Sequence, residues 1–371
     1  MSEMFSWAAL KKLDWFFLAA IVALLGIGIA FVISASARTE DMPISTMAGR
    51  QVGWVIAGVL CFFAVVLMDY EKAGDAAWGI YFATIVLLVL VLVMGKRIYG
   101  AYRWLNLFGI TVQPSEFAKV SIVIVLARFL SEPNRNIQSP KTLFHVLFII
   151  AIPCLFIMKQ PDLGTAMTIV PVALVLMFAA GMPLRYLVIL GIVCLLALIP
   201  AWFMLKDFQR ERILVFFDSN RDPLGAGWNK LQSEIAVGSG GLTGKGYLMG
   251  TQNVLGFLPR TVAPTDFIFS VIAEETGFVG SATLLSLFSI LLLGGVRAAH
   301  RARDKMGRLL AVGVVTLLFS HVFVNMAMTV GLMPITGIPL PLISYGGSFM
   351  VCMMAALGLV QSVYVRRSRR G

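Results

Sequence analysis

Runs of about 20 apolar residues recur along most of this chain, and they limit its fold more than any other feature of the sequence. A helix of that length crosses the hydrocarbon core of a lipid bilayer. Only 13% of the 371 residues are charged, whereas soluble domains average about 25%. Because backbone groups in lipid must be hydrogen-bonded within the protein, we expect the spanning segments to be helices. The sequence therefore predicts an all-α polytopic membrane protein.

The apolar runs predict about ten transmembrane helices. They cover residues 15–36, 50–69, 75–95, 115–131, 142–159, 163–181, 185–205, 266–296, 309–332 and 341–365. The segment 97–114 is expected to be re-entrant or to lie in the membrane interface. A large loop of about residues 206–265 separates the seventh span from the eighth. We expect the whole chain, residues 1–371, to form a single integral membrane domain.

Lysine and arginine residues are unevenly distributed between the two sides of these spans. If the N-terminus lies inside, the short inside segments carry many more of them than the short outside segments, as cytoplasmic loops do. Both termini are therefore expected in the cytoplasm, and the 206–265 loop outside it. The net charge of +11 is then largely a topology signal and does not indicate nucleic-acid binding. The basic stretch Arg366–Arg370 suits anionic membrane lipids.

Cysteine and histidine residues indicate neither a disulfide framework nor a zinc site. The four cysteines, which lie far apart in apolar runs without any CxxC spacing, are Cys61, Cys154, Cys194 and Cys352. The three histidines are scattered as well. No cofactor follows from the sequence, and a divalent cation (Mg or Mn) held by carboxylates stays an open alternative.

The large loop does not have the composition of a simple linker. Phe208–Phe217 and Trp228–Val237 mix apolar and charged residues at near-helical spacing, which predicts two short helices lying in the interface. Glycines are frequent from Gly225 to Gly250, and glycine lets the backbone turn sharply or approach a ligand closely. The alternative is a merely flexible loop.

Asp266 stands where this loop becomes an apolar segment. Together with Thr265 it could simply cap the start of a helix. The functional alternative is a general base at the membrane surface, whose pKa burial would raise and the helix dipole would lower. Glu274 follows eight residues later, about 80° round the helix, so it could share a cavity with Asp266, whereas Glu275 lies about 180° away. Both glutamates could equally be paired structural charges.

Three other apolar segments begin with a polar sequence on the same predicted outer side. These starts are Gln113–Lys119, Gln160–Thr165 and Pro339–Ser348. In the first, Glu116 and Lys119 share a helix face, so they could form a structural ion pair, or Glu116 could hold Lys119 for a phosphate. With Arg50 and Arg103 close by in the sequence, four polar helix starts favour an anionic ligand at the outer leaflet over four independent caps.

These motifs together closely resemble the SEDS family (shape, elongation, division and sporulation proteins). The resemblance rests on Gln113–Lys119, Gln160–Thr165, Asp222–Trp228, Ile235–Gly246, Thr265–Gly277 and Gly337–Ser348, which span nearly the whole chain in the family's order. The short N-terminus and the glycine-rich loop look more like the cell-elongation branch than the division branch. One stretch departs from the family: Leu258–Phe267 is longer than usual and has Arg260 and Pro264 where the family has Glu and His.

The resemblance implies a peptidoglycan glycosyltransferase that polymerises lipid II into glycan strands at the outer face of the cytoplasmic (inner) membrane during cell elongation. The family's catalytic carboxylate corresponds to Asp266, which would take the proton of an attacking sugar hydroxyl. Candidate substrate-binding residues are Glu116, Lys119, Arg50, Arg103, Asp162, Ser233, Glu274 and Ser344. Of these, Lys119, Arg50 and Arg103 are candidates to face the leaving diphosphate. The implied partners are a class B penicillin-binding protein, which is a transpeptidase, and other proteins of the elongation complex.

Two rival functions remain open at this point. A lipid II flippase or transporter would suit ten spans with charged residues at depth, but it should need polar groups that continue into the cytoplasmic half. The polar helix starts cluster on the outer side instead, which favours chemistry at that surface. A non-catalytic scaffold of the cell-wall elongation machinery would tolerate the change Asp266→Asn.

Overall fold

The computed structural model describes residues 11–36, 44–98, 101–107, 110–223, 225–258 and 262–367. Within these ranges nine helices are long and apolar enough to cross a membrane, so the predicted helical, multi-pass fold is confirmed. These helices are α1 (Trp15–Ser36), α2 (Ile44–Leu67), α4 (Ala77–Met94), α6 (Pro140–Lys159), α7 (Leu163–Ala180), α8 (Leu184–Met204), α12 (Ile268–His300), α13 (Lys305–Thr329) and α14 (Gly347–Val365). The short helix α3 (Tyr70–Asp75) joins α2 to α4.

The fourth predicted span is also a helix, α5 (Pro114–Ser131). It is less apolar than the other nine because Glu116, Lys119 and Arg128 interrupt its sequence. The helix is nevertheless enclosed by the bundle, with most of its side chains buried. Every one of the predicted apolar segments therefore corresponds to a helix, and α5 carries the buried charges of Glu116 and Lys119.

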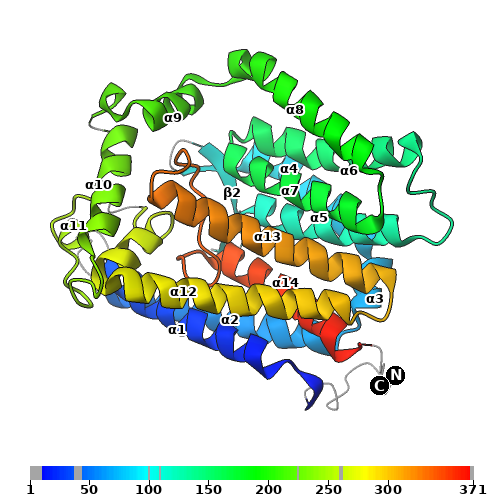
Figure 1. Cartoon of the computed structure of the whole chain (residues 1–371), viewed down its shortest axis with the longest axis horizontal. Coiled ribbons are helices and arrows are strands. Elements are labelled where there is room, and N and C mark those ends of the chain that lie inside the picture. Colours follow the sequence, from blue (N-terminus) through cyan, green and yellow to red (C-terminus); the bar gives the residue numbers. More distant parts are fainter. Residues whose placement is uncertain are drawn as a thin grey trace.

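The bundle has a central pair of helices and a peripheral arch. In α14, 89% of the spanning window is buried, and in α13 61%, so these two helices form the core of the bundle. In α8 none of the window is buried. Figure 1 shows α8 continuing into α9 (Asp207–Phe217), α10 (Ala226–Ser239) and the short α11 (Thr251–Val254), which together arch over one end of the bundle.

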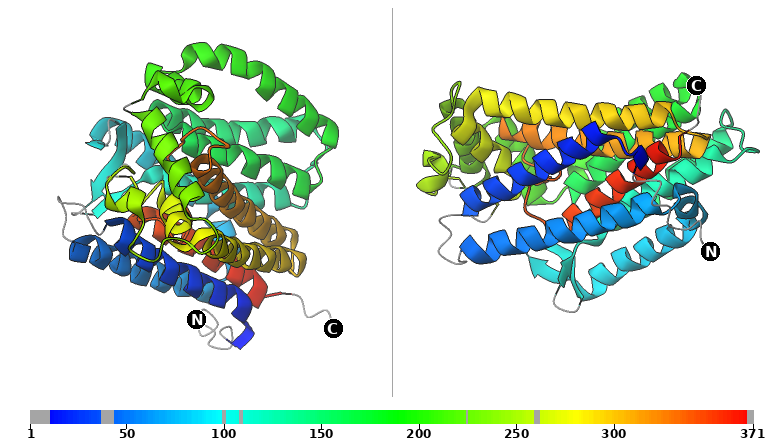
Figure 2. Two further views of the ribbon diagram at one scale, coloured as in Figure 1. Left: turned by 60° about the vertical axis from the view of Figure 1, so that its left-hand side comes forward. Right: turned by 90° about the horizontal axis from the view of Figure 1, so that it is seen from below.

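The start of α1 and the end of α14 lie at the opposite end of the bundle from this arch (Figures 1 and 2). They are joined there by polar contacts. The guanidinium of Arg297, near the end of α12, lies 2.8 Å from the carboxylate of Asp14, and the backbone N–H of Asp14 donates to the side chain of Gln361. This arrangement agrees with a predicted topology in which both ends of the chain share one side.

The segment 97–114, predicted to be re-entrant or to lie in the membrane interface, contributes to a small antiparallel sheet in the order β1–β2–β3, which the sequence did not indicate. Its strands are β1 (Lys96–Ile98), β2 (Ala101–Leu107) and β3 (Ile110–Val112). In the register of this sheet, Trp104 pairs with Lys96, and Leu105 with Val112. The aromatic and β-branched residues of this stretch favour strands. The sheet leads directly into α5 and presents Arg103 and Trp104 at the arch end of the bundle.

The predicted short helices of the large loop correspond to α9 and α10, and the loop that follows α10 is anchored to a break in α12. At the break Gly277 has φ 65° and ψ −157°, a conformation open essentially to glycine alone. The amides of Phe278 and Val279 donate to the carbonyls of Gly241 and Leu242, at 2.8 and 3.0 Å. Backbone groups that the broken helix leaves unpaired are thus bonded by the loop.

At the same break, amides of the loop also donate hydrogen bonds to carbonyls of α12. The amides of Lys245 and Gly246 donate to the carbonyls of Glu274 and Glu275, each at 3.0 Å. The break therefore separates off a short helical segment, Ile268–Thr276, whose end is pinned by the loop. Asp266 lies just before the other end of this segment.

We expect Gly277→Ala to destabilise the protein more than Gly181→Ala, which serves as its matched control. Both glycines have a positive φ, 65° and 96°, where another residue costs about 1–3 kcal/mol. A Cβ on Gly277 would also lie 2.7 Å from the carbonyl oxygen of Leu242, whereas nothing lies within 4 Å of a Cβ on Gly181. Melting temperatures of the purified variants in detergent would measure the difference, and equal decreases would contradict the tight fit at the break.

Candidate functional site

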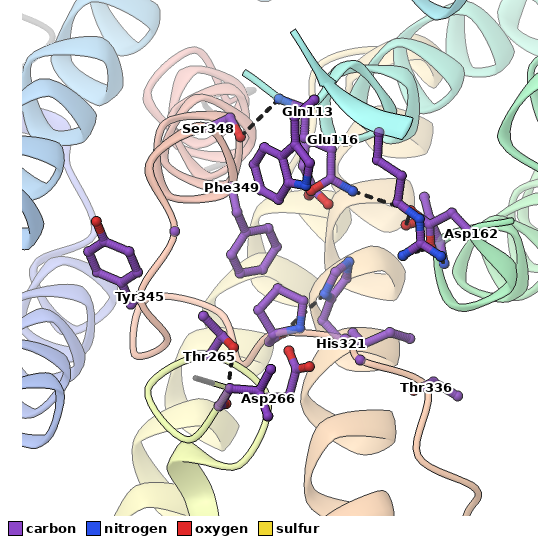
Figure 3. A pocket seen from close by; sticks show the side chains of 18 of the residues that line it. Gln113, Glu116, Asp162, Thr265, Asp266, His321, Thr336, Tyr345, Ser348 and Phe349 are labelled. Carbon is purple, nitrogen blue, oxygen red and sulfur yellow. Dashed lines mark hydrogen bonds and ion pairs between the residues drawn. The ribbon is translucent and has the colours of Figure 1, made fainter. Parts of the chain in front are cut away.

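A cavity of about 480 Å³ opens at the arch end of the bundle, where helix starts and connecting loops converge. It is lined by Arg103, Trp104, Gln113, Glu116, Lys119, Asp162, Thr165, Arg212, Val262, Thr265, Asp266, His321, Thr336, Gly337, Ile338, Pro339, Tyr345, Gly346, Ser348 and Phe349. These residues come from β2, the starts of α5, α7 and α14, the helices α9 and α13, and the loops that precede α12 and α14. Segments far apart in the sequence thus share one polar chamber (Figure 3).

Asp266 points into this cavity (Figure 3) and does not cap the helix that follows it. The residue at the cap position of α12 is Phe267, and no side-chain bond caps this helix. The alternative that Asp266 serves only as a helix cap is therefore not what the structure shows. The carboxylate faces the chamber instead.

Four hydrogen bonds hold the backbone around Asp266 and the neighbouring loop before α14. The side-chain amide of Asn325, on α13, donates both to the carbonyl of Asp266 at 2.9 Å and to the carbonyl of Ile338 at 2.8 Å. The hydroxyl of Ser344 donates to the carbonyl of Thr265 at 2.5 Å. The amide of Tyr345 donates to the carbonyl of Pro264 at 2.9 Å. The loops before α12 and α14 are therefore tied together, with α13 behind them.

Burial raises the pKa of Asp266 from 3.8 to about 6. The positive charge of Arg212, hydrogen bonding by the Thr265 side chain and the more distant charge of Arg103 all act against this increase, and the negative charge of Asp162 adds to it. Desolvation is the largest of these effects. The carboxyl group therefore titrates close to neutral pH, which is the range in which a general base is effective.

The opposite wall of the cavity carries a buried cation, Lys119. Its ammonium lies 2.8 Å from the carboxylate of Glu116 and 2.8 Å from Nε2 of His321. It also lies 5.4 Å from the centre of the Phe349 ring. Lys119 is only 3% exposed, so its charge depends on these partners.

A second charged pair, Arg103 and Asp162, lies beside the first. The Asp162 carboxylate accepts from the backbone and the hydroxyl of Thr165, at 3.2 and 2.9 Å, and so caps α7. It also accepts from the side chain of Gln113 at 3.2 Å, and the guanidinium of Arg103 is 3.7 Å away. Arg103 is held further by the carbonyls of Gln160 and Pro161. The predicted residues Asp266, Glu116, Lys119, Arg103 and Asp162 are thus brought together in one chamber.

Four other predicted substrate-binding residues do not line the cavity. Ser233 is fully buried, donates to the carbonyl of Thr329 and lies 2.7 Å from the hydroxyl of Ser270, so it joins α10 to α12 and α13. Ser344 lies behind the wall, where its hydroxyl accepts from the amide of Leu340 besides bonding the carbonyl of Thr265. Their geometry is that of structural contacts.

Glu274 and Arg50 are the other two. The Glu274 carboxylate accepts from the ammonium of Lys245 at 2.7 Å, from the hydroxyl of Thr251 and from the amide of Gln252. It therefore fastens the loop after α10 and does not line the cavity that contains Asp266. Arg50 is an exposed residue of α2.

Sequence reasoning missed three residues that line the cavity, Trp104, Arg212 and His321. Trp104 belongs to the unexpected sheet, and Arg212 is one of several charges on α9. A histidine in an apolar span is itself a signal, because polar side chains at membrane depth generally need a partner or a function. Of the two positions that depart from the family motif, Arg260 lies outside the described residues. Pro264 contributes its backbone carbonyl to the loop contact.

A metal centre was left open by the sequence. In the described part of the chain, no three His, Cys, Asp or Glu side chains are grouped closely enough to hold a metal ion. The carboxylates of Glu116 and Asp162 are engaged by Lys119 and by Thr165 and Gln113, respectively.

Comparison with known proteins finds similar proteins both by sequence and by structure. The family of FtsW, RodA and SpoVE, described as "Cell cycle protein", matches residues 15–369. The "Peptidoglycan glycosyltransferase MrdB" of Escherichia coli (strain K12) is 41% identical over 327 residues, which are 86% of each chain.

Two solved structures share the fold over almost the whole chain. One, described as "Structural coordination of polymerization and crosslinking by a peptidoglycan synthase complex", has a TM-score of 0.80 and 31% identity, covering 96% of this chain and 99% of the other. The Rod shape determining protein RodA of Thermus thermophilus has a TM-score of 0.72 and 28% identity, covering 96% and 98%.

The raised pKa of Asp266 predicts a pH-dependent stabilisation by Asp266→Asn. Because the pKa of about 6 in the folded protein exceeds the usual 3.8, folding is favoured by protonation, and this favourable contribution is lost as the pH rises through that window. The uncharged variant should therefore melt at a higher temperature than the wild type at about pH 7.5, with the gain shrinking toward about pH 4.

Melting temperatures across this pH range would measure the effect. Glu234→Gln, which neutralises a more accessible carboxylate on α10, is the control and should show no comparable trend. A gain for Asp266→Asn that is the same at every pH would contradict the raised pKa.

Proposed function

Because the chain belongs to the family of FtsW, RodA and SpoVE cell cycle proteins and is a peptidoglycan glycosyltransferase, we propose that it polymerises lipid II into glycan strands during cell elongation. The reaction takes place at the outer face of the cytoplasmic membrane, in the cavity beneath the arch. The observation that carries the proposal is the pairing of a carboxylate with a pKa of about 6, Asp266, with the cations Lys119 and Arg103 in one chamber.

Asp266 acts as the general base. It accepts the proton of the 4-hydroxyl group of one lipid-linked sugar, and the oxygen of that hydroxyl forms a bond to the anomeric carbon of the second lipid-linked sugar. The bond from this carbon to the diphosphate oxygen breaks, and the electron pair leaves with the lipid diphosphate. A positioned general base contributes about 10²–10⁴ in rate to such a step.

The cations of the chamber stabilise the diphosphate as it leaves. Lys119 and Arg103 place cationic side chains in the cavity, where a charge acts more strongly than in bulk water. Arg212, which reaches the same cavity from α9, adds a third positive group. The diphosphate carries its lipid tail, so the chamber must communicate sideways with the bilayer. Arg212 of α9 lines the chamber, and α8, the uncovered helix that precedes α9, lies on this side of the bundle.

Membership of this family also supports a proposal for the protein's cellular setting. We place the chain in the cytoplasmic membrane as a single integral membrane domain of residues 1–371, with both termini in the cytoplasm and the loop of about residues 206–265 outside. The likeness to a peptidoglycan synthase complex in which polymerization and crosslinking are coordinated supports a class B penicillin-binding protein, a transpeptidase, as the partner. Membrane lipids and other elongation-complex proteins complete this setting.

Asp266→Asn should abolish polymerisation. Removing the base is expected to lower the rate at least about 100-fold, while the control Glu234→Gln retains wild-type activity. The assay follows glycan-strand formation from lipid II by the purified protein with its penicillin-binding partner, whose own transpeptidase is blocked. A thermal melt confirms that the variant is folded.

Two outcomes would contradict the proposal. If well-folded Asp266→Asn polymerises normally, the base lies elsewhere, and Glu116 is the next carboxylate to change. If the wild-type protein makes no strands but moves lipid II across vesicle membranes, the protein is a flippase.

The pH dependence of the rate should follow the state of Asp266. A protonated carboxyl cannot accept a proton, so kcat should fall about tenfold per pH unit below a pKa of about 6 and level off above it. Initial rates between about pH 5 and pH 8 would measure this. A rate that is constant across the range, with substrate binding unchanged, would exclude a base with this pKa.

A further inference from the structure

His321 is a buried residue of α13 that lies between the two halves of the chamber. It is 1% exposed, and its ring packs against Phe349 with the ring centres 5.0 Å apart. Its Nε2 lies 2.8 Å from the ammonium of Lys119, and its Nδ1 lies 3.3 Å from the carbonyl oxygen of Pro339. Figure 3 shows the side chain beside Asp266 and beneath Glu116.

The partners of His321 determine where its proton lies. An ammonium group can only donate and a carbonyl oxygen can only accept, so Nε2 must accept from Lys119, and Nδ1 must carry the hydrogen and donate to Pro339. The ring is therefore neutral and held at both nitrogens. This assignment follows from the chemistry of the two neighbours.

The hydrogen-bond partners of the three N–H groups of Lys119 can be assigned in the same way. One donates to Glu116 and a second to His321. Within the described ranges no acceptor is present for the third, and Lys119 lines the cavity. The ammonium is thus fixed by two acceptors, with one donor left for a ligand in the chamber.

Resting on the proposed function, we propose that His321 is a positioning residue that holds the Lys119 ammonium against the diphosphate of the donor substrate. The group recognised is a phosphate oxygen of an isoprenyl diphosphate, for which the third N–H of Lys119 is the donor. His321 itself does not contact the substrate in this proposal. It acts through Lys119, because the ammonium stands on a flexible four-carbon stem and the acceptors Glu116 and His321 restrict its orientation.

Because His321 lies on α13, the same helix contacts both the Lys119 side and the Asp266 side of the chamber. Asn325, one helical turn later on the same face, holds the carbonyls of Asp266 and Ile338. His321 holds Lys119 and the carbonyl of Pro339, the residue that follows Ile338. One rigid helix therefore sets the distance between the base and the cation.

Three substitutions separate the two hydrogen bonds of His321. In His321→Gln, the terminal amide reaches the place of Nε2 and its oxygen can accept from Lys119. In His321→Asn, the shorter side chain reaches only the place of Nδ1 and can donate to Pro339. His321→Phe keeps the ring and loses both bonds.

We expect His321→Phe and His321→Asn to lower kcat by about 10- to 100-fold, because a misplaced cation no longer meets the leaving group. His321→Gln should recover the rate to within about threefold of the wild type, since the acceptor for Lys119 is restored. Lipid II polymerisation with the penicillin-binding partner measures these rates, and thermal melts confirm folding.

A binding measurement tests the dependence on Lys119 without turnover. Farnesyl diphosphate is the probe, titrated into the purified protein by calorimetry. Lys119→Met and His321→Phe should each weaken its binding about tenfold, and the double variant should bind no more weakly than Lys119→Met alone. Additive losses would show that His321 does not act through Lys119.

The remaining outcomes each decide the proposal. Recovery by His321→Asn and not by His321→Gln would assign the role to the Pro339 contact and overturn it. Equal losses in all three variants, with lowered melting temperatures, would make His321 a packing residue. If the wild type polymerises lipid II but does not bind the diphosphate, this inference fails while the proposed function stands. If the wild type does not polymerise, the proposed function itself fails.

Discussion

The cost of holding charge away from water is the constraint on which the rest of this structure depends. Buried charges are tolerated only with close partners. Lys119 has Glu116 and His321, and Asp162 has the start of α7 and Arg103. Asp266 has no ion pair within the described ranges, and its pKa rises accordingly. Desolvation, which requires partners for the neighbouring charges, raises the pKa of this carboxylate to about 6, so that it can accept a proton near neutral pH.

The backbone obeys a related rule. Irregular segments within a membrane protein must have their peptide groups bonded by protein, and here the bonds come from distant parts of the chain. Asn325 and Ser344 supply them beside Asp266, and the segment Gly241–Gly246 supplies them at the break in α12. The polar residues of the motifs accordingly divide into those that line the chamber and those that hold its walls.

The sequence predicts the membrane spans and several chamber residues, but it does not separate chamber residues from those that hold the walls. Apolar runs predict the spans because length and hydropathy are local properties, and the polar helix starts identify the chamber residues because each start lies at the same end of the bundle. Ser233 and Glu274 are, like Glu116, polar residues within the motifs, and the sequence does not distinguish their roles. Their partners, Thr329 and Lys245, are remote in the sequence and show them to be structural. The sheet does not follow from the hydropathy of 97–114, because hydropathy does not reveal strand pairing. The role of His321 does not follow from its own position, because its partner Lys119 lies 202 positions away.

The break at Gly277 also has a mechanical consequence. The segment Ile268–Thr276 behaves as a short strut, about 13 Å long, with each end fastened to a different part of the protein. Asn325 and the loop before α14 hold the end at Asp266, and the loop after α10 holds the other. A helical segment that is hydrogen-bonded to the protein at both ends moves less than one that is held at a single end. The orientation of the Asp266 carboxylate is thereby stabilised in part by the segment Gly241–Gly246, which does not line the chamber.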